Sequence, residues 1–169
     1  MEIESKLKKH TISLFVCNKP GVLIRIALVF ARRGYNIDSL VVSASNDPRY
    51  STMNICATGK EVVLDQILKQ LNKLVDVVHA TDRTDEDIIQ RELALIKVHC
   101  EPSERAEVIQ LAHAMECATV DVSEISLTFQ IVGRSEQLDS VNKVLEKYGV
   151  QEIVRTGKVL MARGEEITA

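Results

Sequence analysis

The chain has 169 residues, of which 46% are hydrophobic, 27% charged and 4% aromatic, and its formal net charge is −3. This composition is typical of a folded globular protein and excludes a disordered one. Lysine and arginine are scattered and outnumbered by acidic residues, which argues against binding to nucleic acid. Residues 1–9 are charged where a signal peptide is apolar, and no apolar run approaches the roughly 20 residues of a membrane span. We therefore expect a cytoplasmic protein without a membrane segment.

The first half of the chain predicts the element order βαββαβ. Strand segments are recognised by alternating polarity, and helical segments by apolar residues spaced three and four positions apart. Asn46-Asp47-Pro48 favours a turn between two strands of a hairpin. The predicted strands are residues 10–17, 37–45, 52–58 and 75–79, and the predicted helices begin at Pro20 and Lys60.

The second half repeats this order after a strongly charged segment, Thr81 to Asp87, which we interpret as a linker. We expect an α+β protein with two ferredoxin-like βαββαβ modules in tandem, residues 10–81 and 90–165. Modules of this size leave one sheet face and the sheet edges uncovered, which favours a homodimer. The predicted strands are residues 93–100, 119–123, 126–132 and 152–155, and the predicted helices carry Val108 to Met115 and Leu138 to Tyr148.

The turn between the first strand and the first helix is the most informative local feature. A helix start offers unpaired N–H groups and a positive dipole end, which together suit a carboxylate. Gly21 would let a ligand approach the backbone, and Asn18 could accept a bond from the ligand's ammonium group. The same residues also suit a simple helix cap, because asparagine, proline and glycine are frequent at helix starts. The physical chemistry alone leaves both interpretations open.

Catalytic and metal sites have little support in the sequence. The four histidines form no recognised nucleophile or acid–base arrangement, and the chain has no phosphate-binding glycine motif. His113 and Cys117 are four residues apart on an expected helix, but no paired metal-binding motif accompanies them. We therefore expect no catalytic group, no metal and no cofactor on this chain, and four free thiols. The residues considered for a metal are His99, Cys100, His113 and Cys117.

Several longer strings resemble one family. Residues 10–23 (HTISLFVCNKPGVL) and 30–40 (FARRGYNIDSL) resemble the small subunit of acetohydroxyacid synthase, also called acetolactate synthase. The resemblance continues at residues 70–77 (QLNKLVDV), 91–98 (RELALIKV) and 155–157 (RTG) and thus spans nearly the whole chain.

This resemblance implies an N-terminal ACT domain that dimerises and binds a branched-chain amino acid, typically valine, between two chains. It implies effector contacts from Asn18, Gly21, Val22 and Leu23 of one chain and from Asn36 and Ile37 of its partner. It further implies a catalytic large subunit that carries thiamine diphosphate, magnesium and FAD, which this chain would activate and make sensitive to the effector. The alternative is a freestanding ACT-domain regulator that responds to an amino acid or a metal without an enzyme partner.

One segment departs from the family pattern. Where the family has Phe-Arg-Gly in its second domain, this chain has Met115-Glu116-Cys117. The change reverses a charge and removes a glycine, so we expect an altered loop there. The proposed effector residues lie elsewhere.

Overall fold

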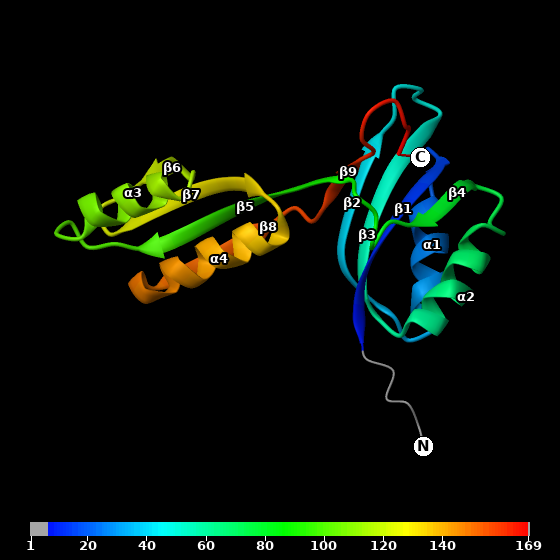
Figure 1. Cartoon of the computed structure of the whole chain (residues 1–169), viewed down its shortest axis with the longest axis horizontal. Helices are drawn as coiled ribbons and strands as arrows, with labels where there is room; N and C mark the ends of the chain where they lie inside the picture. Colours follow the sequence, from blue (N-terminus) through cyan, green and yellow to red (C-terminus); the bar gives the residue numbers. More distant parts are fainter. Residues whose placement is uncertain (1–6, 169) are drawn as a thin grey trace, which may run out of the picture. The chain divides into compact units, whose positions relative to one another are not determined.

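The computed structural model describes residues 7–168 (Figure 1). Residues 1–6, on which part of the expectation about a signal peptide rests, lie outside the described range. No helix within that range is long and apolar enough to cross a membrane. The chain forms two compact units: the first contains the residues up to Ile89 and those from Lys158 onward, and the second is Gln90–Gly157.

The first unit has the predicted order βαββαβ. Its elements are β1 Lys8–Cys17, α1 Val22–Ala31, β2 Asn36–Ala44, β3 Tyr50–Gly59, α2 Glu61–Leu71 and β4 Val77–Asp82. The strands form one antiparallel sheet in the order β2-β3-β1-β4, and both helices lie on the same side of it (Figure 1). Strands β2 and β4 are therefore the outer strands of this sheet.

Alternation along β1 decides which face of the sheet becomes the core. Ile12, Leu14 and Val16 are at most 1% exposed, and they belong to one hydrophobic cluster with both helices. This cluster includes the inner face of α1, formed by Val22, Ile26 and Phe30. Every second residue of the strand and every fourth residue of the helix therefore face each other in this core.

Helix α1 ends in a Schellman motif, as the glycine at position 34 predicts. Gly34 has a φ of +65° and donates its N–H to Ala31, while the N–H of Tyr35 bonds to Phe30 at 3.1 Å. A left-handed residue after the helix allows both bonds, and glycine adopts this conformation without strain. The motif turns the chain into β2 and thereby places Asn36 at the start of that strand.

The second unit repeats the order on its own core. Its elements are β5 Ile89–His99, α3 Arg105–Ala114, β6 Ala118–Val122, β7 Ser126–Gly133, α4 Ser135–Leu145, the 3-10 turn η1 Glu146–Tyr148 and β8 Val150–Arg155. The sheet order is β6-β7-β5-β8, and α3 and α4 cover one face (Figure 1). The alternating residues Ala94, Ile96 and Val98 of β5 are fully buried against these helices. The expected pair of βαββαβ modules is thus confirmed.

Two details differ from the sequence prediction. Strand β4 begins at Val77 rather than at Val75, which is 97% exposed and lies in the preceding loop. A short strand, β9 (Val159–Met161), was not predicted and pairs with β5. The domain boundaries 10–81 and 90–165 remain a prediction, and residues 158–165 group with the first unit in the structure.

Candidate functional site

Asn18 joins the β1–α1 turn to the hairpin between β2 and β3. Its backbone N–H bonds to the carbonyl of Arg49 at 2.8 Å, and its Nδ2 donates to the carbonyl of Pro48 at 3.0 Å. These two bonds fix the orientation of the side-chain amide. The Asn18 Oδ1 atom is then the group available to accept a hydrogen bond from a ligand.

Gly21 precedes the first residue of α1 and needs a conformation that suits glycine. Its φ is +82°, and none of the described atoms lies within 4 Å of the place where a Cβ would stand. The backbone at this point is therefore open to an approaching group.

The N-terminal end of α1 has the electrostatic character of an anion site. No described side chain caps it by a hydrogen bond, and its first turn contains no acidic residue. The other three α-helices each have a glutamate in the first turn: Glu61, Glu107 and Glu136. Arg25 of α1 is paired with Asp76 at 2.5 Å. The partial positive charge of the α1 N-terminus is therefore not offset by a residue of its own first turn.

Val22 and Leu23 follow at the start of the helix in different environments. Val22 is 4% exposed and belongs to the core, and its backbone N–H donates to the carbonyl of Lys19 at 3.4 Å. Leu23 is 43% exposed, and its side chain can contact an apolar group of a ligand. Val22, and not Leu23, therefore faces the core at the start of this helix.

Asn36 and Ile37 lie together at the start of β2. Asn36 is exposed, and its Nδ2 lies 3.4 Å from the Oδ1 of Asp38. The Oδ2 of Asp38 accepts a 2.6 Å bond from the hydroxyl of Thr58. Ile37 is half-buried and packs against the hydrophobic cluster. Asp38 coincides with a register shift between β2 and β3, so the alternation of the strand is interrupted there. Asp38 is not among the residues predicted from the sequence for this site.

The two groups of predicted effector residues lie at opposite ends of α1 within one chain. A helix of 10 residues is about 15 Å long. Asn18, Gly21, Val22 and Leu23 are therefore brought together, whereas Asn36 and Ile37 of the same chain lie too far away to share one small ligand with them.

An open hollow of about 320 Å³ lies next to Asn18, lined also by Cys17, Lys19, Arg49 and Tyr50. Arg49 forms bidentate hydrogen bonds to the carboxylate of Asp47, and its guanidinium holds the pKa of the Asp47 carboxyl below its usual value. The Tyr50 ring stacks on Phe15 with ring centres 5.0 Å apart. Sequence spacing could not reveal this hollow, because its residues come from two segments, 17–19 and 49–50, that lie together only when β1 pairs with β3.

The residues considered for a metal lie in different environments. Cys100 and Cys117 lie in the core of the second unit, and burial raises the pKa of both thiols. His99 is paired with Glu101 at 3.0 Å. Among residues 7–168, no three histidine, cysteine or acidic side chains are placed to hold a metal ion. Both cysteines have the environment of small buried hydrophobic residues.

Comparison with known proteins matches both units. Residues 12–79 match the model described as the small subunit-like ACT domain of AHAS, and residues 91–164 match the small subunit of acetolactate synthase. A probable acetolactate synthase small subunit of Archaeoglobus fulgidus is 40% identical over 158 residues, which are 94% of this chain and 99% of that one. The chain belongs to the family of acetolactate synthase small subunits.

Other small subunits are similarly close. That of Mycobacterium bovis is 42% identical over 93% of this chain and 94% of its own length. The crystal structure of the small subunit from Thermotoga maritima has a TM-score of 0.81 at 37% identity, and covers 94% of this chain and 99% of that one. The first unit is thus an ACT domain of the small-subunit type.

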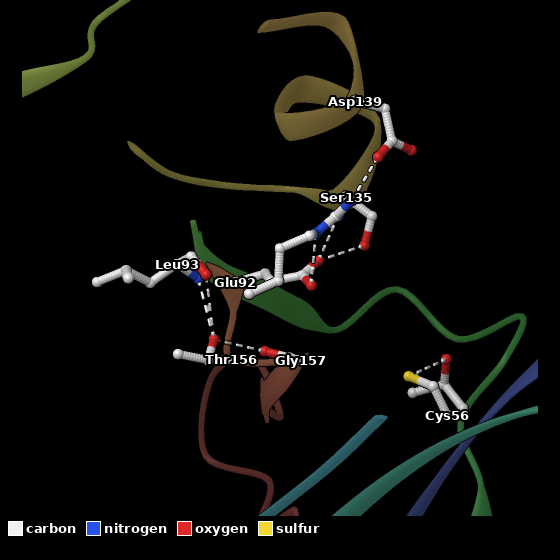
Figure 2. Close-up of polar contacts among 9 residues, drawn as sticks. Cys56, Glu92, Leu93, Ser135, Asp139, Thr156 and Gly157 are labelled. Atoms are coloured by element: carbon white, nitrogen blue, oxygen red, sulfur yellow. Dashed lines mark hydrogen bonds and ion pairs between the residues drawn. The ribbon is translucent and has the colours of Figure 1, made fainter. Parts of the chain in front are cut away.

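Two strings that carry the small-subunit resemblance meet in the second unit. Arg155 forms paired bonds of 3.0 and 2.8 Å with the carboxylate of Glu92, which is only 7% exposed. Ser135 donates to the same carboxylate at 2.9 Å, and Arg155 also bonds Asp139 at 2.5 Å (Figure 2). The ion pairs with both carboxylates raise the pKa of Arg155. This network ties β5, β8 and α4 together, which gives these residues a structural role.

The segment that departs from the small-subunit pattern ends helix α3. Glu116 has a φ of +61° and is the one non-glycine residue with positive φ among those described. Its N–H bonds to His113, and the N–H of Cys117 bonds to Ala112 at 2.9 Å, as in a Schellman motif. The residue with the conformation that favours glycine is thus Glu116, which stands at the family's arginine, and not Cys117, which stands at its glycine.

Proposed function

We propose that this small subunit is the regulatory subunit that raises the activity of the acetolactate synthase large subunit and makes it sensitive to valine or another branched-chain amino acid. We assign no catalytic group to this chain and place thiamine diphosphate, magnesium and FAD on the large subunit. Residues 10–81 would bind the effector and form the homodimer, and residues 90–165 would form the second domain. Family membership over nearly the whole chain supports this assignment.

The observation that carries the effector site is the N-terminus of α1 with its open glycine. An amino-acid carboxylate would bind at the backbone N–H groups in the first turn of α1, where the helix dipole is favourable. The exposed side chain of Leu23 would contact the branched aliphatic side chain. Asn18 Oδ1 would accept a bond from the ammonium group, since its Nδ2 is already used.

The remaining residues would come from a second chain. Strand β2 is an outer strand, and α1 exposes apolar side chains at Ile24 and Leu28, which are 66% and 44% accessible. Pairing of two β2 strands in antiparallel fashion would continue the sheet and cover these side chains. It would also bring the start of the partner's β2 to the end of β2 in the first chain.

This pairing would complete the site. The end of β2 leads into the hairpin at Pro48 and Arg49, to which Asn18 is bonded. Asn36 and Ile37 from the second chain would therefore approach Asn18 and Gly21. Asp38 would arrive with them, and its carboxylate would favour the ammonium group of the effector. We infer that Asp38 is an additional effector residue.

Mixing two defective chains tests this arrangement. Asn18→Ala and Asn36→Ala should each abolish valine binding in a homodimer of the variant. A mixed dimer has one site with both asparagines intact, so mixing the two variants should restore about half of the sites in that dimer. Calorimetric titration with valine measures this recovery. A chain with alanine at both positions provides the control, because its homodimer has no intact site. If each site is built within one chain, mixing restores nothing.

The regulatory role requires the large subunit. Addition of this chain should raise acetolactate formation, and valine should reduce the raised rate but not the rate of the large subunit alone. A freestanding regulator would leave the activity of the large subunit unchanged.

A further inference from the structure

The C-terminal segment 158–168, here called the strap, is fastened to the first unit. Arg83, just after β4, donates from Nη2 to the carbonyl of Thr168 at 2.8 Å. Arg163 forms an ion pair with Asp87 at 3.2 Å, and the N–H of Ala162 bonds to the hydroxyl of Thr168 at 2.7 Å. The charged segment that we interpret as a linker thus also anchors the strap.

The strap lies on the side of the first sheet opposite α1 and α2, where Figure 1 draws the red end of the chain. Leu160 and Ala162 of the strap are 5% and 8% exposed, yet neither belongs to the hydrophobic cluster under the helices. Cys56 of β3 is 2% exposed, and its thiol lies 3.9 Å from the hydroxyl of Thr11 on this same sheet face.

This sheet face is largely polar, although it is buried. Thr11, Ser13 and Asn54 are at most 5% exposed, and Ser13 is directly opposite Asn54 in the register of β1 and β3. The strap is therefore held by the pairing of β9 with β5, by the two buried side chains Leu160 and Ala162, and by a small number of polar bonds. A segment attached in this way belongs to the part of a protein that opens most readily.

The chain passes between the two units twice, at residues 89–90 and at residues 157–158. Just inside the second unit, the N–H of Thr156 bonds to the carbonyl of Leu93 at 3.0 Å, and Arg155 holds Glu92 (Figure 2). These contacts, here called the clip, fix the two passages next to each other. Gly157, with a φ of +90°, is the only residue between the clip and the strap.

We propose that the clip holds the strap on the first unit, so that the state of the second unit is transmitted to the ACT domain through this short tether. With the clip closed, only a few residues separate the strap from the point where the chain leaves the first unit. Opening the clip together with the adjacent end of the β5–β8 ladder, where Ala94 is opposite Arg155, lengthens this tether, and loop closure then costs more entropy. Each doubling of the tether should make the strap open about threefold more often.

Hydrogen exchange and thiol alkylation of the full chain test the coupling. The double variant Glu92→Gln with Arg155→Met removes the ion pair without leaving one buried charge alone. We expect amide exchange in residues 159–162 and alkylation of Cys56 by iodoacetamide to rise about threefold. Lys97→Met is the matched control, because Lys97 and Glu152 form an exposed pair of 3.6 Å between the same two strands, β5 and β8. This control should leave both rates unchanged.

A second variant distinguishes the coupling from unfolding of the second unit. Alkylation of the fully buried Cys100 would report such unfolding. Inserting about eight glycine and serine residues after Gly157 lengthens the tether and leaves the clip intact. The insertion should raise strap exchange and Cys56 alkylation, with Cys100 still protected. The proposal is wrong if the strap of the insertion variant stays as protected as in the original chain. It is also wrong if the strap of the double variant stays so protected while Cys100 is still protected. None of these measurements depends on effector binding or on the large subunit.

Discussion

The ring of Tyr35 occupies the space in which a Cβ at residue 59 would stand, and therefore packs directly on Gly59. The phenol hydroxyl donates to the carbonyl of Lys60 at 2.5 Å, and burial raises the pKa of Tyr35, which keeps the hydroxyl protonated. Because Tyr35 precedes Asn36, this contact fixes the start of β2 and with it the second half of the proposed effector site.

Substitution of Gly59 should therefore destabilise the ACT domain. Gly59→Ala forces the Tyr35 ring to move, and we expect a loss of roughly 1 to 3 kcal/mol in the free energy of unfolding. Urea denaturation measures it. In a Tyr35→Leu background the same alanine should cost less, and equal costs in the two backgrounds would show that the ring is not the obstacle.

Gly21→Asp should abolish the valine response without unfolding the protein. The new carboxylate would stand in open space at the helix start and repel the carboxylate of the effector. Gly21→Asn is the control with the same left-handed backbone and no charge, and it should retain more of the binding. Thermal unfolding with and without valine measures both. A full valine shift in the aspartate variant would show that the ligand is elsewhere.

Glu116→Gly should stabilise the second unit. A glutamate with positive φ costs roughly 1 to 2 kcal/mol relative to an ordinary helical conformation, and glycine avoids this cost but gives more freedom to the unfolded chain. We expect a net gain of about 0.5 to 1 kcal/mol in thermal or urea unfolding. Gly149→Ala, at a φ of +87°, should have the opposite sign. A loss of stability in the Glu116 variant would mean that its side chain contributes more than its backbone costs.

The four thiols should react at different rates with iodoacetamide. Cys17 is half-buried, whereas the other three are buried. Burial also raises the pKa of Cys100 and Cys117, so little of the reactive thiolate forms near neutral pH. Peptide mass spectrometry should find Cys17 alkylated first and Cys100 and Cys117 modified only when the second unit unfolds. Fast reaction of Cys117 in the folded chain would contradict its core position.

The periodic segments allowed most of the fold to be predicted from sequence. Ile12, Leu14 and Val16 alternate cleanly and form the core of the first sheet, and Gly34 ends α1 as its residue type indicates. Val75 misled the prediction because its apolar side chain suggests a strand, although it is 97% exposed in a loop. Strand β9 has three residues and no period that a sequence pattern could reveal.

The candidate site was harder to predict than the fold. Asn18 and Gly21 were found because a helix start has a recognisable sequence, but a cap and a binding site use the same residue types. The bond from Asn18 to Pro48 joins positions 30 residues apart, and local spacing contains no information about it. Asp38 was missed for a similar reason, since its bond to Thr58 arises only when β2 and β3 pair with a register shift.

The chain returns to the first unit after Gly157, so in the sequence the second unit is an insertion within the first and not an addition at its end. One proteolytic cut near residue 89 would leave fragments that both contain part of the ACT unit. Cutting the gene at that point would likewise remove residues 158–168 from the domain in which they are bonded. To isolate the ACT unit intact, residue 89 has to be joined to residue 158 by a short connector.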